Sequence, residues 1–221
     1  FRREWMMPRA YAVVAIAVVP VLLLIQSMLK YASLHMYADI AHWLQLIQNI
    51  ADTGLPHAFT HELIAPGTLN YLSVHFVPLL YLLAIPFKLL QYPQTLLVLN
   101  VLVMSTAAIP LYRIAKRHTG DARFALLAAV LLLWYPTFQY ATLYEFEMLR
   151  FSIPVLLWML YAWERQRIGW CIAFAVLACL VREEVGLTVA MFGVYVALVA
   201  RRRLVGLTLI VLGFAAFAII T

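Results

Sequence analysis

Apolar residues occur along this chain in long blocks separated by short polar stretches. The blocks cover residues 10–29, 94–112, 124–143, 149–163, 168–181, 185–200 and 204–221. A helix needs about 20 residues to cross a hydrocarbon core about 30 Å thick, and several blocks approach that length. The pattern predicts an all-α, polytopic transmembrane helical bundle with about seven spans.

Composition supports the same fold class. Hydrophobic residues make up 66% and charged residues 12% of the 221 positions, and the mean hydropathy is +0.92, which excludes a water-soluble globule. The net charge is +6, but the basic residues lie between apolar blocks, so they indicate orientation and no nucleic-acid partner is expected. Cys171 and Cys179 share one apolar block and predict core packing, not a disulfide framework.

The ends of the sequence bear on its domain organisation. The chain starts at Phe1 and stops at Thr221 inside an apolar block, so we expect a fragment of a longer protein. The first block exceeds the roughly 7 to 15 apolar residues of a signal peptide and is expected to remain as an anchor. We interpret residues 1–221 as a single transmembrane domain whose outer loop, residues 30–92, carries interfacial helices.

The shorter apolar stretch at residues 76–90 decides the orientation. If it does not cross, twelve of the sixteen basic residues lie in the cytoplasm, as the positive-inside rule requires. These are Arg2, Arg3, Arg9, Arg113, Lys116, Arg117, Arg123, Arg165, Arg167, Arg201, Arg202 and Arg203. If it crosses, the last nine of them face the wrong way. We therefore predict an interfacial or re-entrant segment and a cytoplasmic N-terminus.

Residues 37–52 have the periodicity of an amphipathic helix. Ile40, Trp43 and Ile47 fall on one arc at 100° per residue, while Asp39 and His42 fall on the other. The pattern predicts a helix that lies flat on the outer leaflet and is ended by the glycine and proline at positions 54 and 56. Its polar side is either merely solvated or presents Asp39 as a catalytic base.

Two short spans carry charges at their outer ends. Residues 151–163 and 168–181 provide 13 and 14 apolar or small residues, or about 20 Å of a 30 Å core. Nearby lie two charged triplets: Glu145, Glu147 and Arg150, and Arg182, Glu183 and Glu184. Each such charge costs up to about 3 kcal/mol at the hydrocarbon boundary. Either a recessed hydrophilic cavity or snorkelling in a thinned bilayer would lower that penalty.

A cavity open to lipid suits chemistry on an amphiphilic phosphate. Arg182 or Arg150 could bind phosphate oxygens, and Asp39 could accept a proton from an attacking hydroxyl. His35 and Asp39 are spaced i, i+4, so they could contribute to a Mg or Mn site, as could the His57, His61 and Glu62 group; unliganded loop histidines are the alternative. No P-loop, G-x-G-x-x-G or Ser-His-Asp pattern is present.

Five stretches carry a family resemblance. They are Y-A-D-I-A-H-W-L-Q (37–45), H-F-V-P-L-L-Y-L-L-A-I-P (75–86), I-P-L-Y-R-I-A-K-R (109–117), Y-E-F-E (144–147) and V-R-E-E-V-G-L (181–187). In order and spacing the chain resembles the domain of unknown function numbered two thousand and seventy-nine. That family of polytopic membrane proteins is grouped with the GT-C glycosyltransferases.

The resemblance implies transfer of a sugar from a polyprenyl-phosphate carrier to an acceptor at the outer face of a prokaryotic plasma (inner) membrane. Asp39 would be the base, Glu145 with Glu147 the second acid motif, and Arg182 the phosphate-binding residue. Supporting substrate contacts would come from Glu183, Glu184, His75, Arg150 and His42. The chain departs from the family pattern at Ala41 and His42, at Glu147, and at Arg182, where the pattern has Gly, His and Lys respectively.

Two other function classes remain open. A transporter or channel also places charges in spans, although the ionisable residues here gather at one face and no inverted repeat is evident. A non-catalytic membrane scaffold would leave the outer charges merely solvated.

Overall fold

The computed structural model describes residues 9–219, and the side chains of residues 16–219. The predicted cytoplasmic residues Arg2 and Arg3 lie outside the described residues, as does the side chain of Arg9. The described chain is all-helical: its elements are α-helices and short 3-10 turns. The all-α expectation is therefore met over this part of the chain.

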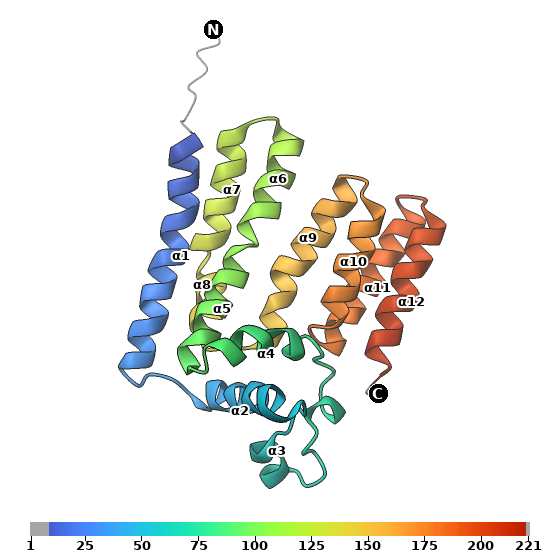
Figure 1. The fold of residues 1–221 in the computed structure, drawn as a ribbon. Coiled ribbons are helices and arrows are strands. Elements are labelled where there is room, and N and C mark those ends of the chain that lie inside the picture. Colours follow the sequence, from blue (N-terminus) through green and yellow to red (C-terminus); the bar gives the residue numbers. More distant parts are fainter. Residues whose placement is uncertain (1–8, 220–221) are drawn as a thin grey trace.

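The helices form an upright bundle with a layer across one end (Figure 1). The bundle contains α1 (Arg9–Ala32), α5 (Pro93–Ser105), α6 (Ala108–Thr119), α7 (Ala122–Trp134), α8 (Pro136–Leu143), α9 (Ser152–Glu164), α10 (Ile168–Cys179), α11 (Glu183–Leu198) and α12 (Arg203–Phe217). The layer, called the α2–α4 layer below, contains α2 (Ala38–Thr53), α3 (Phe59–Ile64) and α4 (Leu80–Leu89). The turns η1 (Tyr71–Ser73) and η2 (Met148–Phe151) complete the described elements.

Helix length supports membrane insertion for part of the bundle. Among the described residues, α5 and α6 together give one 27-residue apolar helix, Pro93–Thr119, that could cross a bilayer. The pair α7 and α8, bent by 50°, is a second candidate. The break falls at Tyr135, because a proline, here Pro136, disfavours the helical conformation of the residue before it. Helix length identifies only one or two spans among the described residues, so the seven predicted spans stay a prediction.

The apolar face of α2 packs on protein. Leu46 and Ile47 of α2 are fully buried, and Leu80 and Phe87 of α4 lie in the same core cluster. The sequence placed this face on the lipid surface, but α4 covers it. The α4 segment itself lies across the bundle instead of running along it, as predicted for residues 76–90 (Figure 1).

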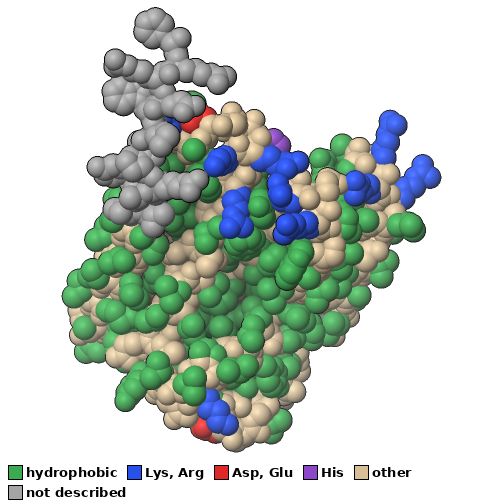
Figure 2. Space-filling model, turned by 45° about the horizontal axis from the view of Figure 1, so that its top comes forward, with side chains coloured by type: hydrophobic (Ala, Val, Ile, Leu, Met, Phe, Trp, Pro, Cys, Tyr) green, Lys and Arg blue, Asp and Glu red, His purple; other side chains and the backbone are tan. Residues whose placement is uncertain are grey.

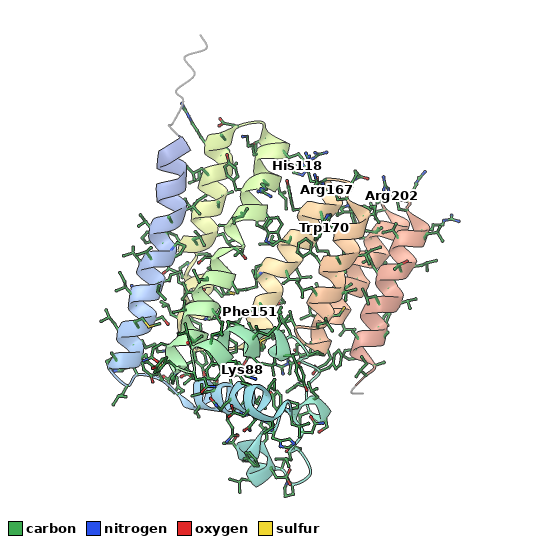
Figure 3. All side chains as sticks on the ribbon, viewed as in Figure 1. Lys88, His118, Phe151, Arg167, Trp170 and Arg202 are labelled. Carbon is green, nitrogen blue, oxygen red and sulfur yellow. The ribbon has the colours of Figure 1, made fainter. Side chains whose placement is uncertain are left out.

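Basic side chains gather at the opposite end of the bundle. Figure 2 shows Lys and Arg side chains clustered there above a largely apolar flank. Figure 3 places Arg167, Arg202 and His118 at this end, whereas Lys88 lies at the α2–α4 layer. Glu164 lies among them, 3.2 Å from His118. The two ends therefore differ in charge as the sequence predicted.

The hairpin of α11 and α12 is held by very close packing. A Cβ atom added to Gly213 would lie 2.2 Å from the carbonyl oxygen of Gly186, and one added to Gly193 would lie 2.8 Å from that of Gly206. Only hydrogen fits at these positions. The glycines therefore set the distance between the helices, and through it the position of the first turn of α11.

Candidate functional site

Three side chains bind the backbone at the end of α8. The carbonyls of residues 141–145 all accept hydrogen bonds from Lys30, Asn100 or Arg150. Asn100 and Arg150 donate over 2.6 to 3.2 Å. The last carbonyls of a helix have no partner within it, so these three side chains satisfy groups that would otherwise be buried unpaired. One Nη of Arg150, a predicted substrate contact, is thus engaged by the backbone.

Glu145 binds the start of α2. Its buried carboxylate is 1% exposed and accepts hydrogen bonds from the backbone nitrogens of Tyr37 and Ile40, the latter at 2.7 Å. Tyr37 has no side-chain oxygen that caps the helix, so Glu145 supplies the missing acceptor and its charge complements the helix dipole. Both oxygens of this predicted second acid therefore have backbone partners.

Arg182, His75 and Glu183 form a partly buried group between the segment that precedes α4 and the start of α11. The Nδ1 atom of His75 lies 2.7 Å from Glu183, whose other oxygen accepts from the backbone nitrogen of Phe76 at 2.8 Å. The Nε2 atom of His75 lies 3.1 Å from Arg182. A neutral imidazole with its proton on Nδ1 satisfies both contacts, since it donates to Glu183 and accepts from Arg182. His75 thereby links the segment that precedes α4 to the start of α11.

Two further carboxylates lie close to Arg182. Glu147 and Glu184 each have an oxygen 3.7 Å from a guanidinium nitrogen, beyond ordinary hydrogen-bond length. The buried Nε of Arg182 has no hydrogen-bond partner in the described part of the chain. The guanidinium is therefore held by the hydrogen bond from its Nη2 to His75 and by the nearby charges, and it keeps further N–H donors for another acceptor.

A row of aromatic rings runs from this group towards Asp39. The ring centroids of Tyr71 lie 5.7 Å from His75, 4.9 Å from His42 and 5.2 Å from His61. Burial, with a contribution from His61, lowers the pKa of His42 to about 4. Burial also raises the pKa of Tyr71 to about 12. Both groups are therefore neutral at pH 7.

Asp39 lies at the exposed first turn of α2, one helical turn before His42. Its charge acts on several neighbours: it raises the pKa of Tyr144, opposes the lowering of the pKa of His42, and contributes to the raised pKa of Tyr71. Asp39 thus interacts electrostatically with members of the aromatic row.

The predicted site residues therefore fall into two groups. Arg182, His75, Glu183, Glu147 and Glu184 are linked by contacts of 2.7 to 3.7 Å. The other predicted residues make the contacts described above outside this group. Glu145 and Arg150 bind backbone, His42 joins the aromatic row, and Asp39 is exposed beside that row.

The predicted metal ligands do not form a cluster. His35 is exposed, and its Nδ1 lies 2.8 Å from the hydroxyl of Ser33. Within residues 9–219, no group of three or more His, Cys, Asp or Glu side chains is arranged to hold a metal ion. The possible metal site on Asp39 and His35 stays a prediction.

Two cavities lie near the layer. The first, of about 570 Å³, is lined by Lys30, His35, Tyr37, Tyr140 and Tyr144 with apolar neighbours, and is called the Lys30 cavity below. A second, of about 410 Å³, lies between the end of α4 and the start of α5 and is largely apolar. Neither of these two cavities is lined by Asp39 or Arg182.

Several important residues had little signal in the sequence. Asn100 was detectable only as an amide within an apolar block, which is a general indication of a buried partner. Lys30 was placed on the outer face without a role. Tyr71 is an aromatic residue in a loop, and only its packing between His42 and His75 identifies it.

A family model described as "Predicted membrane protein (DUF2079)" matches residues 12–221. No curated protein and no solved structure matches the chain.

Proposed function

The chain belongs to this family of predicted membrane proteins, and we propose that it is a glycosyltransferase. The reaction moves a sugar from a polyprenyl-phosphate carrier to an acceptor hydroxyl at the end of the bundle that carries the α2–α4 layer. In this proposal α1, α5 with α6, α7 with α8, and α9 to α12 all cross the plasma (inner) membrane of a prokaryote, and the layer faces outward. Asp39 and His35 are the residues that would hold a Mg or Mn ion, which would supply positive charge to the donor's phosphate.

The observation that carries the proposal is the state of Arg182. Its side chain is 18% exposed, its acidic neighbours lie beyond hydrogen-bond length, and its Nε has no partner among the described residues. A guanidinium in this state can bind two oxygens of a phosphate group. A site that binds the donor's phosphate at the membrane boundary lets the carrier's prenyl tail remain in lipid.

Asp39 is the proposed base. Its exposed carboxylate takes the proton of the acceptor hydroxyl as that oxygen attacks the anomeric carbon. The bond between the anomeric carbon and the phosphate oxygen breaks, and the polyprenyl phosphate leaves with the bonding electrons. Arg182 stabilises the negative charge that develops on the leaving phosphate.

The remaining predicted residues have supporting roles in this proposal. Glu145 positions the turn that bears Asp39, since it binds the backbone on both sides of that residue. Glu183 and Glu147 orient Arg182, the first through His75. His42 and Glu184 are the proposed contacts to the bound sugar.

A transporter is the second class of function. Transport pathways place ionisable groups near the middle of the membrane. The groups described above lie instead at one end of the bundle, next to the α2–α4 layer. The glycosyltransferase is therefore the better supported of the two. It is also preferred over a scaffold because the Nε donor of Arg182 has no partner among the described residues.

The test is a transfer assay with the protein in lipid. The protein is incubated with a panel of polyprenyl-phosphate sugars, and release of free polyprenyl phosphate is measured. We expect Asp39→Asn to abolish release while the protein still inserts and keeps its melting temperature. Asp52→Asn is the matched control, because Asp52 lies at the far end of α2 and is bound by Gln48. Full activity of Asp39→Asn would reject the proposed base, and no release from any donor would reject the transfer reaction.

A further inference from the structure

We propose that the Lys30 cavity binds the phosphate headgroup of a membrane lipid. The cavity lies where the last turn of α1 meets the end of α8, beside the α2–α4 layer. Its volume of about 570 Å³ is within the usual range of ligand pockets. The proposal concerns binding only and does not depend on the transfer reaction.

The first argument is the charge of the cavity. Lys30 donates to the carbonyls of Leu143 and Tyr144, and its Nζ lies 5.7 and 5.6 Å from the ring centroids of Tyr37 and Tyr144. These groups fix the ammonium, but none of them carries a negative charge. Lys30 takes part in none of the ion pairs found within residues 16–219. Its charge is therefore uncompensated at a position where an anion would be stabilised.

The second argument is the hydrogen-bonding capacity that remains. An ammonium has three N–H donors, and two are taken by backbone carbonyls. His35 also lines the cavity, with its Nδ1 beside Ser33 and its second nitrogen available. The hydroxyls of Tyr37 and Tyr140 add further donors. Together these groups offer a phosphate several hydrogen bonds, at least one of them charge-assisted.

The third argument is the surface next to the cavity. The side of α1 that precedes Lys30 exposes Val21, Leu22, Ile25 and Leu29. An acyl or prenyl chain can lie along this apolar stripe while its headgroup enters the cavity. Tyr37 and Tyr140 at the mouth are exposed, and tyrosine is suited to the level of lipid headgroups because it is apolar with a polar tip.

The Lys30 cavity also differs from the Arg182 group. Arg182 has Glu147 and Glu184 within 3.7 Å, whereas no carboxylate lines the Lys30 cavity. An anionic headgroup therefore meets less electrostatic repulsion beside Lys30. Tyr144 lines the cavity and also interacts with Asp39, so a lipid phosphate there would lie near the exposed end of α2.

Native mass spectrometry of the full chain in detergent tests the proposal. The probes are a short polyprenyl phosphate, the matching polyprenol, phosphatidylglycerol and inorganic phosphate. We expect the polyprenyl phosphate to bind at least about tenfold more tightly than the polyprenol. Phosphatidylglycerol and inorganic phosphate are used as competitors to distinguish the sources of phosphate. Competition by phosphatidylglycerol at similar concentration identifies a general phospholipid site. If phosphatidylglycerol does not compete, the site is specific for the polyprenyl phosphate.

Two variants locate the binding. Lys30→Met removes the charge. His35→Glu adds a repelling carboxylate but leaves the bonds from Lys30 to α8 intact, so it tests the site even if Lys30→Met does not fold. In an Arg182→Met background, which removes the phosphate site of the proposed transfer reaction, each should weaken binding of the phosphorylated lipid at least about tenfold and leave polyprenol binding unchanged. Lys88→Met is the control, since Lys88 is an exposed lysine at the same end that does not line the cavity.

Three results would overturn the proposal. The first is unchanged affinity in both cavity variants. The second is loss of all binding of the phosphorylated lipid in Arg182→Met, which would leave Arg182 as its phosphate site. The third is inorganic phosphate binding as tightly as the lipid, which would make the ligand a free ion.

Discussion

Glu145 holds the first turn of α2 from 105 residues away: its Oε2 lies 2.7 Å from the backbone nitrogen of Ile40, and its Oε1 accepts from that of Tyr37. Asp39 lies between these two residues. A carboxylate from the end of α8 thus fixes the backbone of the proposed base, and the same loop is held in turn by Lys30 and Asn100.

Removing this carboxylate should destabilise the layer. We expect Glu145→Ala to lower the free energy of unfolding by about 2 kcal/mol, because the buried N–H of Ile40 and the part-buried N–H of Tyr37 lose a charged acceptor. Glu145→Gln, which keeps one oxygen, should cost less. The measurement is the melting temperature in detergent. Glu184→Gln, at an exposed position, is the control, and equal effects of Glu184→Gln and Glu145→Ala would contradict the capping role.

Asn100 is predicted to be needed for its donors and not for its size. It is fully buried in α5 and donates to the carbonyls of Thr142 and Glu145 at 2.8 and 3.1 Å. Asn100→Leu should cost about 1 to 3 kcal/mol, since the carbonyl of Thr142 loses its side-chain donor and that of Glu145 keeps only Arg150. Asn100→Asp is nearly isosteric but places an acceptor against acceptors, so it should cost at least as much. A melting temperature of Asn100→Asp equal to that of the wild type would exclude the assigned bonds.

His42 makes stability depend on pH. Its pKa in the folded protein is about 4, against 6.5 when unfolded, chiefly because it is buried. Between these values the unfolded chain binds a proton that the folded chain does not, so stability falls as the pH decreases from about 6.5 to about 4. Since the ring is partly exposed, we expect a loss of only about 1 to 2 kcal/mol.

The check on this prediction is the slope of melting temperature against pH. His42→Asn should be less stable than wild type at pH 7 because ring contacts with Tyr71 and His61 are lost. Its melting temperature should nevertheless fall less between pH 7 and pH 4.5. Parallel curves for the two proteins would show that His42 is not the responsible group.

The α11–α12 hairpin should not accept a methyl group at its closest point. Gly213→Ala would place a Cβ 2.2 Å from the carbonyl oxygen of Gly186, so the helices must separate at a cost of about 1 to 3 kcal/mol or more. Gly169→Ala is the matched control: nothing lies within 4 Å of its Cβ, and alanine favours a helix. We expect Gly169→Ala to melt at or above the wild-type temperature. A similar loss in both variants would argue against close packing as the cause.

The sequence alone determined the class of this protein and most of its helices. Apolar blocks of fixed length leave few options other than helices, because backbone groups in an apolar environment must bond within the segment. The amphipathic period of residues 37–52 located α2 to within one residue, and Gly54, with a φ of 77°, ends it as predicted. Charge asymmetry likewise predicted that residues 76–90 form an interfacial or re-entrant segment and not a further span, and α4 lies across the end of the bundle (Figure 1).

Only the tertiary structure decided what the polar residues do. Hydropathy and period are properties of one segment, whereas the partner of Glu145 is a helix start 105 residues earlier, and the partners of Lys30 are carbonyls more than 110 residues later. Charge and spacing cannot distinguish a carboxylate that caps a helix from one that faces a substrate. Which acid is buried and which, like Asp39, stays exposed depends on how distant segments pack, and the same packing put α4, not lipid, against α2.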